Sequence, residues 1–116
     1  MSSLPEILDQ TLKAALQRSQ PQICLPRYLK EIQETEKLPE RIIVLGAGKA
    51  SAEMANVLED HWKGTIWGVK LSGLVLTRYG YGVPCKSIEI VEAAHPVPDE
   101  IGQITAQRIL NLAESA

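Results

Sequence analysis

The feature that most constrains the fold is an apolar run that ends in a glycine turn. Residues 42–45 read Ile-Ile-Val-Leu, and the turn Gly46-Ala47-Gly48 follows directly. Continuous branched apolar runs of this kind are typical of strands that helices cover on both faces of a parallel sheet. Apolar residues then recur at helical spacing as far as Trp62. The order of strand, glycine turn and helix indicates an α/β domain.

Segments on both sides of this unit extend the predicted order of elements. A first helix begins at a capping box formed by Ser3 and Glu6, and it should end near Ser19. Asp99 is placed to cap a last helix, with Glu100 in its first turn. We also expect a solvated connector over residues 20–40, with at most a short helix at 28–36, and two further strands at 73–77 and 88–91.

The predicted fold class is α/β, a Rossmann-like three-layer sandwich with a mainly parallel sheet. Residues 1–40 form an N-terminal helix and connector, and residues 41–116 form the start of the α/β domain. Three strands are few for such a sheet, so we expect an incomplete N-terminal part of a larger domain. About ten residues without a helix join the second and third strands, which is short for a parallel crossover. The direction of that pair is therefore left open.

Composition excludes several classes of partner. The 116 residues carry a formal net charge of −2, and only 4% are aromatic with no Phe. A nucleic-acid partner is not expected, because such binders present basic patches and stacking side chains. No apolar run approaches the ~18 residues of a membrane span. The first residues do not resemble a signal peptide, so we expect a cytoplasmic protein with Cys24 and Cys85 as free thiols.

Lys49 is the candidate at the centre of a binding site. It follows Gly46 and Gly48, and it precedes Ala50 and Ser51 at the start of the predicted helix. Free amides and the positive end of the helix dipole favour anions there, whereas a lysine at that end costs about 0.3–1 kcal/mol. A bound phosphate or carboxylate would satisfy both. The same residues are also compatible with an ordinary turn and a solvated lysine.

Polar residues follow the other two strands as well. Arg78 ends the second strand, and His95 follows the third. If the strands are parallel, both lie near Lys49 at the carboxyl edge of the sheet, where α/β domains bind ligands. His95 could exchange a proton near neutral pH, or it could simply fix its loop. Asp99 reads as a helix cap rather than a metal ligand, and no metal site is predicted.

Two phosphate-binding motifs fail on inspection. The dinucleotide fingerprint places glycine or alanine where this chain has Ser51, and no acid follows the second strand. Arg78 could bind the 2′-phosphate of NADP, so the failed fingerprint weakens the case for NADP as a cofactor but does not exclude it. The Walker A loop requires glycine at the position of Ile43 and Ser or Thr at the position of Ala50.

Three motifs in order carry a resemblance to a known family. They read Gly-Ala-Gly-Lys-Ala at 46–50, Thr-Arg-Tyr-Gly at 77–80 and Ala-Ala-His-Pro-Val-Pro-Asp at 93–99. Together they resemble the N-terminal domain of the glycerate 2-kinases associated with the MOFRL domain, whose members are often labelled hydroxypyruvate reductases. The resemblance spans roughly residues 4–113.

The resemblance implies transfer of the ATP γ-phosphoryl group to D-glycerate with Mg²⁺, with Lys49 as the catalytic residue in an interdomain cleft. It implies glycerate as the small-molecule substrate and a C-terminal domain of the same protein as the partner, and it leaves a homodimer open. The family's second domain is absent here, so we expect no activity from these 116 residues alone. The alternatives are an NAD(P)H-dependent hydroxypyruvate reductase and a non-catalytic module that binds small anions.

Overall fold

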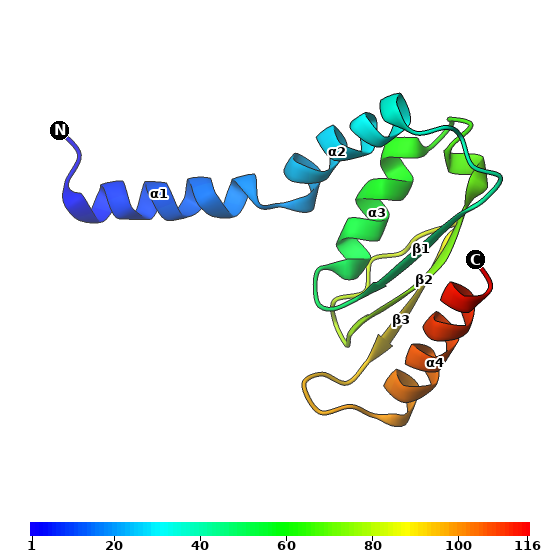
Figure 1. Ribbon diagram of the computed structural model, residues 1–116. Coiled ribbons are helices and arrows are strands. Elements are labelled where there is room, and N and C mark those ends of the chain that lie inside the picture. The colour runs from blue at the N-terminus through cyan, green and yellow to red at the C-terminus, as the bar shows by residue number, and fades with distance from the viewer.

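The computed structural model describes residues 1–116 as four helices and a three-stranded sheet (Figure 1). In chain order the elements are α1 (Leu4–Arg18), α2 (Pro21–Thr35), β1 (Ile42–Ala47), α3 (Ser51–Trp62), a short 3-10 helix η1 (Gly68–Lys70), β2 (Leu71–Arg78), β3 (Ile88–Ala93) and α4 (Glu100–Glu114). None of the helices combines the length and apolar character that crossing a membrane requires.

The sheet has the order β1-β2-β3, and both strand pairs are parallel. Ile42 pairs with Leu71, and Gly73 pairs with Ile88. The sheet lies between α3 and α4 (Figure 1), which confirms the predicted α/β class and its parallel sheet. It also settles the direction of β3, which the sequence had left open.

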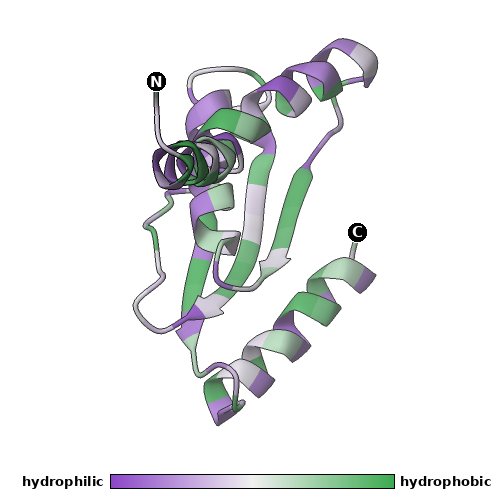
Figure 2. Cartoon of the chain, turned by 90° about the vertical axis from the view of Figure 1, so that its left-hand side faces the viewer, coloured by the Kyte–Doolittle hydropathy of each residue, from purple (hydrophilic) through white to green (hydrophobic).

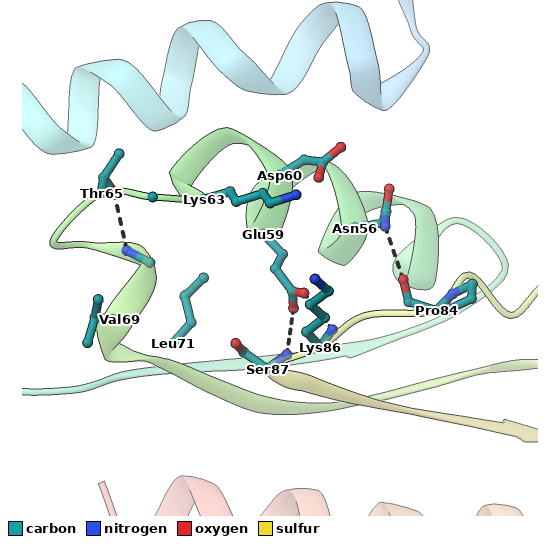
Figure 3. A pocket seen from close by; sticks show the side chains of 12 residues that line it. Asn56, Glu59, Asp60, Lys63, Thr65, Val69, Leu71, Pro84, Lys86 and Ser87 are labelled. Atoms are coloured by element: carbon teal, nitrogen blue, oxygen red, sulfur yellow. Dashed lines mark hydrogen bonds between the residues drawn. The ribbon is translucent and has the colours of Figure 1, made fainter.

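The connection between β2 and β3 is parallel although it contains no helix. Residues 79–87 return to the start of β3 as irregular chain against α3. The Glu59 carboxylate on α3 lies beside Lys86 and Ser87 (Figure 3) and accepts hydrogen bonds from their amides at 2.5 and 3.0 Å. It also accepts one from the Ile88 amide at 3.3 Å. The Asn56 side chain donates to the Pro84 carbonyl at 3.1 Å. Helix α3 therefore anchors a crossover that would otherwise leave its amides without partners.

The buried core lies mainly between α3 and the sheet. One cluster joins Leu29, Trp62, Trp67 and Leu71, and a second joins Ala52, Ala55, Val75 and Ile88. The two indole rings lie 5.3 Å apart between centroids. Both tryptophans are therefore core residues. Met54, one of the apolar residues that recur at helical spacing, is 44% exposed, because the buried face of α3 runs through Ala52, Ala55 and Trp62.

The N-terminal region contains two helices rather than one. Helix α1 has the predicted capping box and ends at Arg18. Residues 20–40, expected to be mostly a solvated connector, instead contain the 15-residue helix α2, with Pro26 inside it. The prediction failed because α2 is stabilised by tertiary packing: its Leu29 is buried against α3 and β2, and Gln22 donates to Glu53 at 2.6 Å.

Helix α1 projects away from the rest of the chain (Figure 1) and has no buried residue. Leu4, Leu8, Leu12 and Leu16 are all more than half exposed. The radius of gyration is 17.2 Å, whereas a compact chain of this length would have about 13 Å. The extended shape is therefore due to an amphipathic helix without a partner in this chain.

Replacing Glu59 with alanine should destabilise the fold, because three main-chain amides would lose a charged acceptor. We expect a loss of about 1–3 kcal/mol in the free energy of unfolding, measured by urea denaturation. The matched control is Asp60→Ala, since the neighbouring Asp60 is exposed and accepts no side-chain hydrogen bond. Equal effects of the two substitutions would contradict the anchoring role.

The Cys85 thiol should react slowly in the folded protein. Both cysteines are free, as expected, and burial together with the nearby Glu59 carboxylate raises the pKa of Cys85 from 9.0 to about 11. Only the thiolate is nucleophilic, so at pH 8 alkylation should be about 100-fold slower than for an unperturbed thiol. Since pH 7–9 lies below the raised pKa, the rate should rise about tenfold per pH unit there.

The rate is measured by mass spectrometry on the Cys24→Ser variant, which retains Cys85 alone. The same variant in urea supplies the reference thiol, and similar rates in the folded and unfolded states would refute the shift.

Candidate functional site

The carboxyl ends of the three strands meet around a cavity of about 330 Å³. Because the strands are parallel, β1, β2 and β3 all end at this edge of the sheet. Its lining includes four of the residues that the sequence singled out, Gly48, Lys49, Arg78 and His95. Residues distant in sequence are thus brought together as predicted. Their function as binding residues stays a prediction.

The glycine turn is fixed by hydrogen bonds to β2. The Gly48 amide donates to the Leu76 carbonyl at 3.0 Å, and the Ser51 hydroxyl donates to the carbonyls of Gly48 and Leu76 at 2.6 and 3.2 Å. Gly48 has φ of +114°, a conformation that side chains disfavour. Gly46 has no such backbone, and an added Cβ would lie 3.5 Å from Val75 and Ser51, which is ordinary contact. Only Gly48 therefore needs to be glycine for the turn itself.

Helix α3 begins at this turn without a side-chain cap. Its N-cap residue is Ala50, which has no side-chain oxygen, and the main-chain amides of buried Ala52 and partly exposed Glu53 donate to no group in the chain. Free amides at the positive end of a helix dipole are suited to an anion. Lys49 is exposed beside them and forms no ion pair within the chain. The absence of a cap is the strongest structural sign of an anion site here.

Buried Thr77 holds the main chain of Lys49 in place. It is 3% exposed, and its hydroxyl donates to the Lys49 carbonyl at 3.4 Å across the gap between β2 and the turn. The sequence placed Thr77 at the carboxyl edge of the sheet but assigned it no contact. A polar residue that ends an apolar strand beside a glycine turn was the signal for this role.

Arg78 is half-buried, and its loop is held by a carboxylate that the sequence analysis missed. The amides of Gly80 and Gly82 donate to Glu92 Oε1 at 2.8 and 3.1 Å. The Arg78 guanidinium lies 5.9 Å from the centroid of the Tyr81 ring and forms no ion pair within the chain. Glu92 thus fixes the loop that follows Arg78.

Like Glu92, the second carboxylate near the site, that of Asp99, already has hydrogen-bond partners. Asp99 caps α4 as predicted: its side chain accepts from the Gly102 amide at 2.9 Å and from the Tyr79 hydroxyl at 2.9 Å. The hydrogen bond from the Gly102 amide is the main cause that lowers the pKa of Asp99, and the Tyr79 hydroxyl contributes as well. The hydrogen bond that Tyr79 donates to Asp99 raises the pKa of Tyr79.

His95 is exposed on the loop that precedes α4. The chain has no group of three or more His, Cys, Asp or Glu side chains placed to hold a metal.

A second cavity, of about 490 Å³, adjoins the first along the glycine turn. Its lining is mainly apolar and is contributed by α2, β1, α3 and β2. Gly46, Ala50 and Ser51 line this cavity rather than the polar one, whereas Gly48 and Lys49 border both. The predicted site residues therefore divide between an apolar chamber and a polar chamber on either side of the turn.

A third hollow, of about 310 Å³, lies at the other end of α3 (Figure 3). Glu59, Lys63 and Lys86 are among its charged lining residues. The Glu59 carboxylate is occupied by main-chain amides of the crossover. We therefore attribute this hollow to the anchoring of β3 and not to ligand binding.

The chain is similar in sequence to a protein family and to several known proteins. The family model described as "Domain of unknown function (DUF4147)" matches residues 7–116. A protein of Agrobacterium vitis named "Putative hydroxypyruvate reductase" is 41% identical over 107 residues, covering 92% of this chain and 22% of that protein. The "D-glycerate 2-kinase" of Thermotoga maritima is 33% identical over 112 residues, covering 95% of this chain and 25% of that protein.

A further relative, the "Glycerate 2-kinase" of Pyrococcus horikoshii, is 38% identical over 76 residues, or 66% of this chain and 16% of that protein. No solved structure matches this chain. The protein is thus an α/β domain with a glycine turn at the carboxyl edge of its sheet. It belongs to the DUF4147 family, and it spans about a fifth of the length of these relatives.

The two glycines of the turn should respond differently to alanine. Gly48→Ala should cost about 1–3 kcal/mol in unfolding free energy, because φ is positive there. Gly46→Ala should range from no change to about 1 kcal/mol of stabilisation, because its backbone and surroundings accept a methyl group. Thermal or urea denaturation of both variants measures this. A larger loss at Gly46 than at Gly48 would contradict the described turn.

Proposed function

We propose that this chain supplies the N-terminal part of a glycerate kinase, in which Lys49 faces the reacting phosphoryl group. The observation that supports this most is the uncapped start of α3 beside a lysine that forms no ion pair. Two relatives are named as glycerate 2-kinases, which suggests the substrate. In this proposal the ATP γ-phosphoryl group is transferred to a hydroxyl of D-glycerate.

Phosphoryl transfer requires positive charge near the transferred group, and the residues of this site can supply it. Phosphoryl transfer depends mostly on positioning and on neutralising charge that spreads over the phosphoryl oxygens. The Lys49 ammonium would supply that neutralisation, assisted by the positive end of the α3 dipole behind it. The planar Arg78 guanidinium matches the glycerate carboxylate, which it can bind through two parallel hydrogen bonds. His95 lines the same cavity and can donate a hydrogen bond to either anion.

The magnesium ion that such a kinase uses would need ligands from elsewhere. Mg²⁺ in phosphoryl-transfer sites is held by carboxylates together with phosphate oxygens. Here Glu92 binds loop amides, and Asp99 binds the Gly102 amide and the Tyr79 hydroxyl. The residues of this chain therefore do not fit a magnesium site, and the metal ligands would lie in the part of the relatives that this chain does not cover.

The same reasoning predicts that the isolated chain is inactive. Lys49 is exposed, and the polar cavity is open, so nothing excludes water from a transferring phosphoryl group. The chain also covers only about a fifth of its relatives. We propose that the opposite wall of the site comes from the remaining polypeptide of the full-length protein, a C-terminal domain in the family's arrangement.

A reductase is the second candidate, because relatives are named as hydroxypyruvate reductases. Arg78 at the end of β2 lies where a dinucleotide-binding sheet holds the ribose, and it could bind the 2′-phosphate of NADPH. Ser51 counts against this reading, since it replaces the third small residue of the fingerprint. A module that binds small anions without catalysis would need only the start of α3 and Lys49.

The deciding experiment uses a full-length protein that contains this region. We expect ATP-dependent phosphorylation of D-glycerate, and Lys49→Ala should lower kcat about 10²–10³-fold, as removal of one preorganised charge-stabilising donor does. Lys63→Ala is the control, because Lys63 is an exposed lysine at the far end of α3. The 116-residue chain should show no activity.

The alternatives give different results in the same preparation. Oxidation of NADPH by hydroxypyruvate, without phosphorylation of glycerate, would favour the reductase. Stabilisation by phosphate or glycerate with neither activity would favour the anion-binding module. Full kinase activity in the Lys49→Ala protein would remove the central element of the proposal.

A further inference from the structure

Strand β1 lies at an edge of the sheet but has the composition of an interior strand. From Ile42 to Ala47 it contains no charged residue and no proline, and Figure 2 shows it as hydrophobic over most of its length. Each residue from Ile42 to Gly46 is only partly buried. Long apolar edges invite pairing with another strand, so natural edge strands usually carry charges, prolines or bulges.

The opposite edge of the same sheet has such protection. Strand β3 carries Glu89 and Glu92, and Glu89 forms an ion pair with Arg108 of α4. Glu92 accepts the amides of Gly80 and Gly82 from the neighbouring loop. The two edges thus differ in protection: β3 carries charged residues that disfavour pairing with a further strand, and β1 carries none.

The outward backbone groups of β1 are available for pairing. Along a parallel strand, successive residues direct their N–H and C=O groups alternately to the two sides. The Gly48 amide donates to Leu76 on β2, so the even-numbered residues of β1 face β2. The groups of Ile43, Leu45 and Ala47 therefore point to the free side. No strand in this chain pairs with them.

Helix α4 leads from the far edge of the sheet back to this free edge. It follows β3, packs on the face opposite to α3, and its last turn lies beside the start of β1, where the Arg41 guanidinium donates to the Ser115 carbonyl (Figure 1). Crossovers between parallel strands are right-handed, so one that reverses direction across a sheet must use the opposite face. The path of α4 is that of a helix that precedes a strand next to β1.

We propose that the free edge of β1 binds a fourth parallel strand, supplied by polypeptide that the longer relatives have and this chain does not cover. The strand order would then be fourth, β1, β2, β3. The relatives are long enough to supply it, because this chain covers only 22% and 25% of two of them. A second copy of this chain is the less suitable occupant, since a two-fold axis would pair β1 with itself in an antiparallel direction.

This strand would determine where the ligand lies. In open α/β sheets, ligands bind beyond the carboxyl ends of the strands at the point where the strand order reverses. With a fourth strand on its free side, β1 becomes that point, and the glycine turn with Lys49 lies directly at its carboxyl end. The fourth strand would then border the apolar cavity that the free edge of β1 now leaves open.

Amide hydrogen exchange on the 116-residue chain and on a full-length protein containing it tests the pairing. In the full-length protein, the amides of Ile43 and Leu45 should exchange about 100-fold more slowly than in the short chain. Val44 and Gly46, which face β2 in both proteins, are the internal controls. Fast exchange at Ile43 and Leu45 in both proteins would overturn the proposal.

A proline variant provides a second measurement. Ile43→Pro removes an amide that is unpaired in the short chain but would be paired in the full-length protein, so it should lower the melting temperature more in the latter. Equal losses in the two proteins would contradict the proposal. Protection of Ile43 in the short chain that disappears on dilution, with none in the full-length protein, would assign the edge to a second copy instead. Neither measurement depends on catalysis, so the kinase proposal can fail while this one holds, and the reverse.

Discussion

Burial of β2 between two helices is the constraint on which the rest of the structure depends. Leu74 and Val75 are each 1% exposed, and both neighbouring strands take their register from β2. Because all three strands run in the same direction, their carboxyl ends lie at one edge, where the loops carrying Lys49, Arg78 and His95 meet. The site therefore results from sheet direction, and no single loop contains it.

Local chemistry at the site was predictable from sequence, because it depends on neighbours in the chain. The glycine turn, the Asp99 cap and the capping box of α1 all follow from residues within a few positions. Contacts between distant residues were not predictable. Glu59 makes a short crossover parallel, and Leu29 stabilises a helix whose own sequence looks solvated. Met54 is exposed for a related reason, since tertiary packing buries a different face of α3.

The candidate site combines groups of two kinds. One kind forms hydrogen bonds within the protein and holds the turn in one conformation: Gly48, Ser51 and Thr77. Lys49 and Arg78 form no ion pair, and the amides of Ala52 and Glu53 in the first turn of α3 have no acceptor within the chain. A rigid frame that carries uncompensated positive charge is what preorganised anion binding requires, because little reorganisation is needed when the ligand arrives.

Helix α3 also connects this site mechanically to the start of β3. Its first turn borders the apolar cavity beside the glycine turn, and Glu59, two turns further along, fixes the chain that enters β3. The helix is a strut about 18 Å long at 1.5 Å per residue. It cannot slide along its axis toward a ligand without pulling on the amides that Glu59 holds. The position of the glycine turn and the register of a strand at the other end of the domain are thus set by one rigid body.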